Sequence, residues 1–295
     1  MNRHFLFTIL LLVSPMAGQS VFNSLDTPTS VRSLSLTNGA SAVSTSILNS
    51  NPAVLDCEGK SFGGQFFAYP ADITGHQLHY TSKTARGVVS TVVTVMDFGR
   101  FSDSATGETF SARDMVFRVG YKSIWSGHLS WGISAGGIHS VIQQYRSSGL
   151  FVNTGIRSRF LDDRLGVGIS AENMGKMLST YAGRREPMEG QIRYSCFYQP
   201  LHLPATLSVD YLNVNSGQPL IITAAEFNLN SGFALWISAS SEKNSLAWGD
   251  VFRTLTAGIA GGVRLPIGNY VFDVGFQNLG SAGSVWGFGI GKQRN

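Results

Sequence analysis

The residues best suited to chemistry in this sequence are its histidines, because an imidazole ring can bind a metal ion or exchange a proton near neutral pH. His76 and His79 are three positions apart, and His139 stands directly before Ser140. On a β-strand, side chains at adjacent positions or three positions apart point to opposite faces. Both pairs lie in strand-like segments, so we expect neither a metal site nor a serine nucleophile activated by histidine. No catalytic residue and no cofactor is predicted, and we expect a protein that is not an enzyme.

Glycine-rich runs and polar pairs are the next candidates for binding. Gly132 to Gly137 and Ala257 to Gly262 lack the GxxxxGK[ST] pattern of a phosphate loop. We interpret them as small residues that face a lumen, or as places where another segment approaches the wall closely. Glu172 and Asn173 could contact a ligand, although a polar pair facing a lumen or ending a strand is the simpler interpretation. The net charge is only +4, without a basic cluster interleaved with aromatic residues, which disfavours a nucleic-acid partner.

The two cysteines are interpreted as unpaired residues. An oxidising compartment would permit a disulfide between Cys57 and Cys196. The surrounding pattern instead predicts Cys57 in a loop and Cys196 as a small strand residue. Neither has a second cysteine or a histidine at the spacing of a metal site.

The elements that must position these residues are short segments in which bulky apolar residues alternate with small or polar ones. In Ala205 to Asn213, Leu207, Val209 and Tyr211 share one face, while Thr206, Ser208 and Asp210 share the other. Hydrophobic residues make up 43% of the chain, yet no apolar run reaches the ~18 residues of a membrane-spanning helix. This pattern predicts an all-β protein, a transmembrane antiparallel β-barrel with an apolar outer face and a polar lumen.

The alternation predicts about fourteen strands, an even number as in bacterial barrels. They are expected near residues 61–69, 74–81, 87–98, 113–123, 128–140, 150–160, 164–174, 190–199, 204–213, 219–228, 232–241, 252–265, 269–277 and 284–291. Three connections are predicted to be long, at 99–112, 179–189 and 241–250, and all three fall at one end of the barrel. Aromatic residues near strand ends, among them Phe66, Phe67, Phe197 and Tyr198, are expected to form interfacial girdles.

The N-terminal part of the chain has a different character. Residues 1–19 combine a basic start (Arg3, His4), a short apolar run (Phe5 to Val13) and small residues near Ala17, as in an export signal. Residues 20–58 are rich in Ser, Thr and Asn and have no period of two or of 3.6. We therefore expect residues 20–58 to form a plug segment inside a barrel made of residues 59–295.

Several motifs of this chain, in this order and spacing, resemble the PorV/PorQ family of FadL-like outer-membrane proteins, and PorQ members most closely. The plug carries Pro28-Thr29-Ser30-Val31-Arg32, followed by Asn51-Pro52-Ala53. Further similar pieces follow along the barrel, at 69–73, 97–99, 107–112, 144–149, 168–175 and 181–187. The resemblance implies a fourteen-stranded barrel with an N-terminal plug, located in the outer membrane of a Gram-negative type of cell.

The resemblance also implies a function, which is a non-enzymatic role in type IX protein secretion or in the attachment of cargo to the cell surface. The partners would then be outer-membrane lipid, other secretion subunits and secreted cargo, with Arg184, Arg185 and Glu186 in a partner-facing loop. The plug residues Pro28, Ser30, Arg32, Asn51, Pro52 and Ala53 are the candidate site. The alternative is a FadL-like channel with a hydrophobic ligand in its lumen, which needs an apolar pocket and a wall opening beside the plug.

Overall fold

The computed structural model describes residues 23–102, 109–181, 188, 190–214, 218–230, 232–242 and 256–294. The predicted export signal at 1–19 and the loop residues Arg184, Arg185 and Glu186 lie outside these ranges. Within the described part of the chain, no helix is long and apolar enough to cross a membrane.

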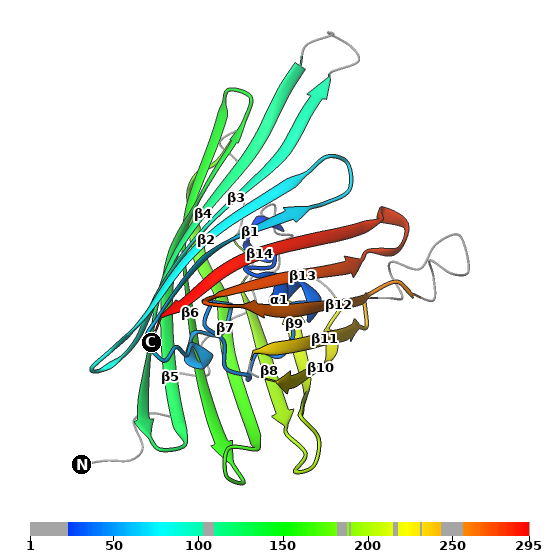
Figure 1. Cartoon of the computed structure of the whole chain (residues 1–295). Helices are drawn as coiled ribbons and strands as arrows, with labels where there is room; N and C mark the ends of the chain where they lie inside the picture. The colour runs from blue at the N-terminus through cyan, green and yellow to red at the C-terminus, as the bar shows by residue number, and fades with distance from the viewer. Residues whose placement is uncertain are drawn as a thin grey trace, which may run out of the picture.

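Fourteen antiparallel strands form a closed barrel in which each strand pairs with its neighbours in sequence and β1 pairs with β14 (Figure 1). The strands are β1 (Lys60–Ala68), β2 (Thr74–Thr84), β3 (Gly87–Ser102), β4 (Thr109–Ser126), β5 (Leu129–Ile142), β6 (Tyr145–Phe160), β7 (Leu165–Ser179), β8 (Gln191–Tyr198), β9 (Ala205–Val214), β10 (Leu220–Asn230), β11 (Phe233–Ser240), β12 (Ile259–Ile267), β13 (Tyr270–Asn278) and β14 (Ser284–Arg294). The predicted transmembrane barrel is therefore confirmed, with all fourteen strands.

The connections differ between the two ends of the barrel. At one end, here called the short-turn end, every connection has between two and six residues. The opposite, long-connection end carries β3–β4, β7–β8 and β11–β12, so the three connections predicted to be long do share one end. The first is shorter than predicted, because β3 runs on to Ser102 and β4 begins at Thr109. The strand predicted at 252–265 begins only at Ile259, and residues 251–255 are outside the described ranges.

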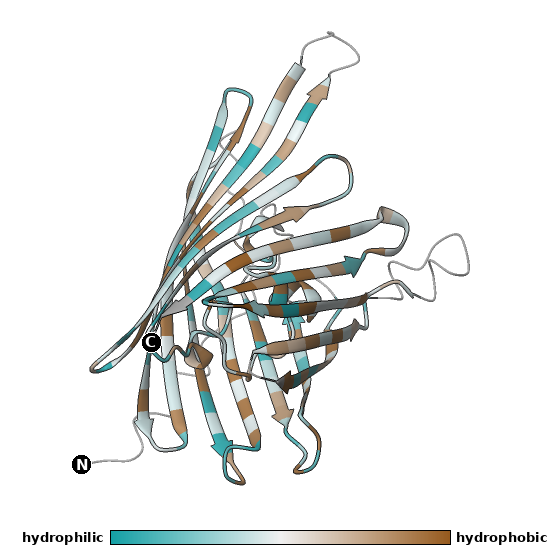
Figure 2. Ribbon diagram, in the orientation of Figure 1, coloured by the Kyte–Doolittle hydropathy of each residue, from teal (hydrophilic) through white to brown (hydrophobic). Residues whose placement is uncertain are grey.

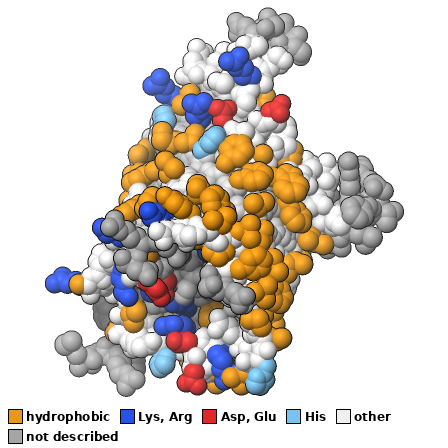
Figure 3. Space-filling model, viewed as in Figure 1, with side chains coloured by type: hydrophobic (Ala, Val, Ile, Leu, Met, Phe, Trp, Pro, Cys, Tyr) orange, Lys and Arg blue, Asp and Glu red, His pale blue; other side chains and the backbone are white. Residues whose placement is uncertain are grey.

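The two faces of the wall follow the predicted alternation. On β9, Leu207 and Val209 are exposed, whereas Ser208 and Asp210 are buried toward the lumen. Apolar and polar residues alternate along the strands in Figure 2, and Figure 3 shows apolar side chains spread across the outer wall. Such an apolar outer surface suits a barrel that is surrounded by lipid.

Residues 23–59 lie inside the barrel as a plug (Figure 1). Its regular elements are three short helices: η2 (Asn23–Leu25), α1 (Val31–Ser35) and η3 (Pro52–Val54). α1 packs against β11 to β14, whereas η3 packs against β4, β5 and β6, so the plug reaches opposite parts of the wall. A short fourth helix, η4 (Gly280–Ala282), lies in the β13–β14 connection.

Apolar packing holds the α1 part of the plug to the wall. Val31, Leu34 and Leu36 are fully buried in a cluster that includes Phe67 of β1 and Phe197 of β8. The prediction that these two phenylalanines belong to aromatic girdles is wrong. Adjacent residues on a strand point to opposite faces, so only the neighbours Phe66 and Tyr198 are exposed.

Glycines in the wall make room for the plug. A Cβ added to Gly132 would lie 2.4 Å from the backbone carbon of Pro52, and one added to Gly262 would lie 2.1 Å from the Ser35 hydroxyl. The interpretation of the two glycine-rich runs as places of close approach is confirmed at both positions. Side chains at these positions would collide with the plug, so glycine sets the path that the plug follows.

Candidate functional site

The first plug motif begins and anchors α1. The Ser30 side chain accepts a hydrogen bond from Ser33 N at 3.0 Å and caps the helix. Arg32, one residue into the helix, donates from Nε to Glu226 Oε2 of β10 at 2.6 Å. Pro28 lies just before the cap and lines an internal cavity. These residues therefore order the plug and tie it to the wall.

The second plug motif performs the same task on the opposite wall. Asn51 is fully buried and caps η3 by accepting from Ala53 N at 3.1 Å. Pro52 occupies the first turn of η3, where a missing N–H costs nothing. The Ala53 carbonyl accepts a hydrogen bond from Ser130 of β5 at 3.0 Å. The two motifs do not meet in one site, since they anchor different parts of the plug.

The histidines lie as the strand pattern predicts. His76 is exposed on the outer face of β2, while His79 is buried on the lumen face. His139 is exposed and Ser140 is buried, where its hydroxyl bonds to Asp114. Among the described residues, no group of three or more His, Cys, Asp or Glu could hold a metal ion.

Both cysteines are free thiols, as interpreted from the sequence. Cys57 is half-buried in the loop before β1, and Cys196 is exposed on the outer face of β8.

Two cavities lie on either side of the plug. The first, of about 340 Å³, lies between the plug and β4 to β10. The second, of about 540 Å³, lies toward the short-turn end and is lined by Lys60 and Lys83 among others. The plug residues Ser30, Arg32 and Ile47 line both cavities. The plug therefore stands between two open spaces of the lumen.

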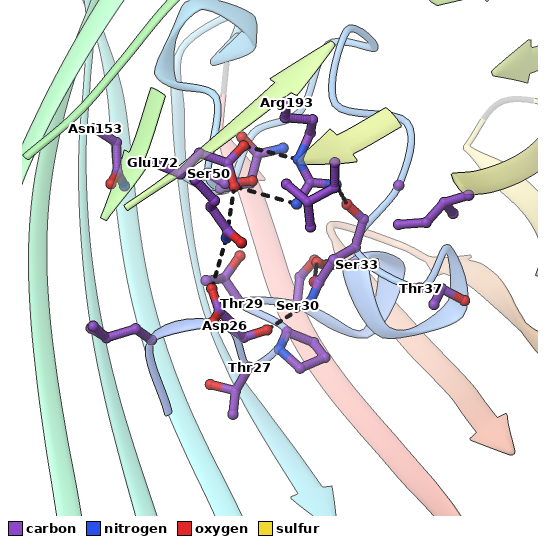
Figure 4. Close-up of a pocket in the computed structure, with 18 of the residues that line it drawn as sticks. Asp26, Thr27, Thr29, Ser30, Ser33, Thr37, Ser50, Asn153, Glu172 and Arg193 are labelled. Atoms are coloured by element: carbon purple, nitrogen blue, oxygen red, sulfur yellow. Dashed lines mark hydrogen bonds and ion pairs between the residues drawn. The ribbon is translucent and has the colours of Figure 1, made fainter. Parts of the chain in front are cut away.

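A buried ion pair forms the polar wall of the first cavity (Figure 4). Arg193 of β8 donates from Nε to Glu172 Oε1 of β7 at 2.9 Å, and neither side chain is more than 4% exposed. Arg193 also donates from Nη1 to the Asn38 carbonyl of the plug at 3.0 Å. The pair therefore links two strands of the wall with the plug.

Asp26 is the plug residue that faces this ion pair. Its Oδ1 accepts hydrogen bonds from Asn173 Nδ2 and Gln191 Nε2, each at 2.9 Å. The side chain keeps surface open to the cavity, but the barrel encloses it. This enclosure, together with the nearby Glu172 carboxylate, raises the pKa of Asp26 to about 6. Asp26 can therefore change charge in mildly acidic water, and it does so at a contact between plug and wall.

A bulge in β7 explains why two consecutive residues face the lumen. Asn173 has a φ of 54°, and its backbone N–H donates to Asn153 Oδ1 of β6 at 2.7 Å. Both Glu172 and Asn173 are consequently buried. The interpretation of this pair as facing the lumen is confirmed.

The wall changes its pairing at the same bulge. Within the described residues, β7 pairs with β8 only as far as Glu172 opposite Gln191. Its pairing with β6 continues to Ser179 opposite Ser148. The upper part of β7 thus leaves β8 beside the cavity that holds Asp26.

An apolar cluster lies in the lumen next to this break. It consists of buried Leu25, Val116, Ile138, Phe151 and Met188, with Met177 and Tyr181 packed against it. Leu25 belongs to the plug and also lines the first cavity. Met188 and Tyr181 belong to the β7–β8 connection, and the side chains of these two residues pack into the cluster. This cluster was not predicted from the sequence. Val116 and Ile138 could have indicated it, because both are apolar residues at strand positions that face the lumen.

The comparisons with known proteins show the fold and little beyond it. No protein-family model and no curated protein matches this sequence. Solved structures do match. The toluene transporter TbuX of Ralstonia pickettii has a TM-score of 0.62 at 11% identity, over 90% of this chain and 98% of that one. The monoaromatic hydrocarbon channel CymD has a TM-score of 0.65 at 11% identity, with the same coverage.

A FadL homologue of Pseudomonas aeruginosa matches with a TM-score of 0.54 at 9% identity, again over 90% and 98% of the two chains. Identities this low show a shared fold alone. The FadL-like part of the sequence resemblance is therefore confirmed, whereas the comparisons do not single out the PorV/PorQ group.

Proposed function

We propose that this protein is an outer-membrane channel for small hydrophobic molecules, without enzymatic activity, and that its plug closes it in the state described. The observation that carries the proposal is the apolar cluster of Leu25, Val116, Ile138, Phe151 and Met188, which is located where β7 leaves β8. The solved structures with this fold include a toluene transporter and a monoaromatic hydrocarbon channel, which supports the same ligand class.

The apolar cluster provides a ligand site once the Met188 side chain leaves it. Met188 is 7% exposed and contacts the cluster through a flexible, polarizable side chain. An apolar molecule of similar size would take its place among Val116, Ile138 and Phe151 at little cost in packing. From there, the break between β7 and β8 leads toward the membrane, while the plug blocks the direct way through the lumen.

A pair of matched substitutions on β5 tests this function. Ile138 is 2% exposed inside the cluster, and Ile133 on the same strand is 42% exposed on the outer face. Ile138→Phe fills the cluster, so we expect uptake of toluene to fall by about tenfold, the effect of ~1.4 kcal/mol. Ile133→Phe makes the same chemical change toward lipid and should leave uptake unchanged. Uptake is measured with radiolabelled toluene in a Gram-negative host that expresses each variant.

Two results would overturn the proposal. One is that cells with the unsubstituted protein take up toluene no faster than cells with an empty vector. The other is that Ile138→Phe and Ile133→Phe reduce uptake equally. Altered gel mobility without boiling verifies that each variant folds as a barrel.

A second candidate function is the PorQ-type role in type IX secretion or cargo attachment. The ordered motifs from Pro28 to Ala53 support it, and so does a lumen that is filled by the plug and lined mainly by polar groups. In this case the barrel holds partners through its outer connections and transports no small molecule.

Deleting the gene separates the two functions. Loss of surface cargo with unchanged toluene uptake supports the secretion role. Normal cargo export with reduced toluene uptake supports the channel and contradicts the secretion role.

A further inference from the structure

The outer face of the barrel carries a pocket near the long-connection end, with charged and apolar side chains in its lining. This rim pocket, of about 300 Å³, is lined by Asp97 of β3, Arg113 and Met115 of β4, and His139 and Val141 of β5. Arg113 is paired across the strands with Asp97 on one side and with Val141 on the other, and Met115 is paired with His139. Residues at these paired positions share a face, so the pocket is one continuous patch of the outer wall.

The position of the rim pocket along the membrane normal can be estimated from β4, the strand that carries Arg113. Trp125 is 67% exposed on β4 near the short-turn end, and Arg113 lies twelve positions away on the same strand. Twelve residues of an extended strand span ~40 Å. At a tilt of about 45° this corresponds to a height of about 28 Å, slightly more than the ~25 Å apolar band of a membrane barrel. If Trp125 marks one edge of the band, Arg113 stands at the opposite edge, at the level of the lipid headgroups.

The surface around the rim pocket agrees with this placement. Figure 3 shows basic, acidic and histidine side chains gathered beyond the apolar wall, toward the end where β3 and β4 extend. Two further arginines are exposed at neighbouring positions: Arg100 is paired with Ser111, and Arg146 is paired with Val141. The patch therefore has an excess of positive charge, which attracts anionic headgroups.

The side chains of the rim pocket are held ready for a phosphate group. Arg113 donates from Nη2 to Asp97 Oδ2 at 2.6 Å, yet 64% of its side chain is exposed. The second Asp97 oxygen accepts from Gly99 N at 2.9 Å, which fixes the carboxylate. His139 Nδ1 contacts Ser148 Oγ at 2.9 Å, so its Nε2 is the ring nitrogen left for a ligand. A fixed guanidinium edge beside an imidazole matches the oxygens of a phosphate group.

We propose that the rim pocket binds the phosphate group of a membrane lipid in the leaflet at the long-connection end. Arg113 and His139 bind the phosphate oxygens, Asp97 holds Arg113 in position, and Met115 and Val141 contact the first part of an acyl chain. The pocket faces away from the lumen, so this inference stands independently of what the channel carries.

Lipid retention tests the proposal. The purified protein, in detergent with added phosphatidylglycerol, is analysed by native mass spectrometry as the unsubstituted chain, as the double variant Arg113→Gln/His139→Gln, and as Arg86→Gln. Arg86 lies in the β2–β3 turn at the short-turn end and is the matched control. We expect the double variant to retain about fivefold to tenfold less lipid and Arg86→Gln to retain as much as the unsubstituted chain.

Three outcomes overturn the proposal. The first is equal lipid retention by the double variant and the unsubstituted chain. The second is an equal loss in Arg86→Gln, which would indicate general charge attraction. The third is displacement of the lipid by millimolar inorganic phosphate, which would indicate a site for free anions. Gel mobility without boiling verifies that each variant is folded.

Discussion

The contact of Asp210 with the plug gives a quantitative test of how the plug is held. Asp210 is fully buried on β9, and its two carboxylate oxygens accept from Ala40 N at 2.7 Å and from Ser41 N at 3.1 Å. Asp210→Asn keeps the size of the side chain, but it turns one acceptor into an NH₂ group that faces a backbone N–H. A hydrogen bond to a charged group contributes about 1.5–3 kcal/mol and a neutral one about 0.5–1.5 kcal/mol. Losing one charged bond and weakening the other therefore costs about 3 kcal/mol.

This cost predicts how often the plug leaves its place. A change of about 3 kcal/mol raises the equilibrium fraction of displaced plug by about 150-fold. The displaced state is measured as opening events in planar lipid bilayers and as the rate at which a protease cleaves the plug. Asp273→Asn is the control, because Asp273 hydrogen-bonds within the wall to Arg264 of β12 at 2.8 Å. The reasoning is refuted if Asp210→Asn opens no more often than Asp273→Asn.

Three further predictions concern other contacts of the plug and its wall. A Cβ at Gly132 would lie 2.4 Å from the plug backbone, whereas one at Gly137 on the same strand would meet its nearest neighbour at 3.4 Å. Gly132→Ala should therefore weaken plug attachment by about 1–3 kcal/mol and speed protease cleavage, and an equal effect of Gly137→Ala would contradict this. Arg193→Met leaves the buried Glu172 carboxylate without its partner, so the free energy of unfolding in urea should fall by about 3–5 kcal/mol, and Arg193→Met/Glu172→Leu should recover most of it. Because the pKa of Asp26 is raised from 3.8 to about 6, the attached plug binds a proton more tightly than the displaced plug. The resulting stabilisation is complete below pH 3.8 and is lost as the pH rises through about 6, so plug cleavage should accelerate over this range. An identical pH profile in Asp26→Asn would exclude Asp26 as the cause.

The barrel could be predicted because a membrane imposes a strict alternation on every strand that crosses it. Lipid selects a bulky apolar residue on one face, and the wet lumen selects a small or polar residue on the other. The same reason explains where the prediction was wrong. Beyond the bilayer both faces of a strand meet water, so the ends of β3 and β4 between Gly99 and Ala112 have the polar composition of a loop while still pairing as strands.

The candidate site was less predictable, because it depends on contacts between distant segments. The bulge at Asn173 turns Glu172 and Asn173 to the same face, which a regular alternation does not allow. Phe67 was predicted to belong to an interfacial aromatic girdle, but the plug provides an apolar surface inside the lumen, and that surface explains a buried phenylalanine there. The burial of Met188 could not be predicted from the sequence around it, because its neighbours have the composition of an ordinary polar connection.

The plug is held in two different ways, and this difference determines how it can move. Its first residues are attached by polar contacts and by one apolar side chain. Ser24 donates to Asp114 at 2.6 Å, the Leu25 carbonyl accepts from Arg118 at 2.7 Å, and the Leu25 side chain lies in the apolar cluster. Because each bond has a charged partner, it contributes about 1.5–3 kcal/mol. The neighbouring contact of Asp26 weakens when this carboxyl group loses its proton.

By contrast, α1 buries two side chains, Val31 and Leu34, against the wall at about 1.5–3 kcal/mol each, and the ion pair of Arg32 with Glu226 adds to this attachment. The residues before α1 should therefore detach first, while α1 stays attached. Raising the pH through the titration of Asp26 should expose protease sites only before Ser30. Asp210→Asn acts on the residues that follow α1, so it should expose sites after Ser35.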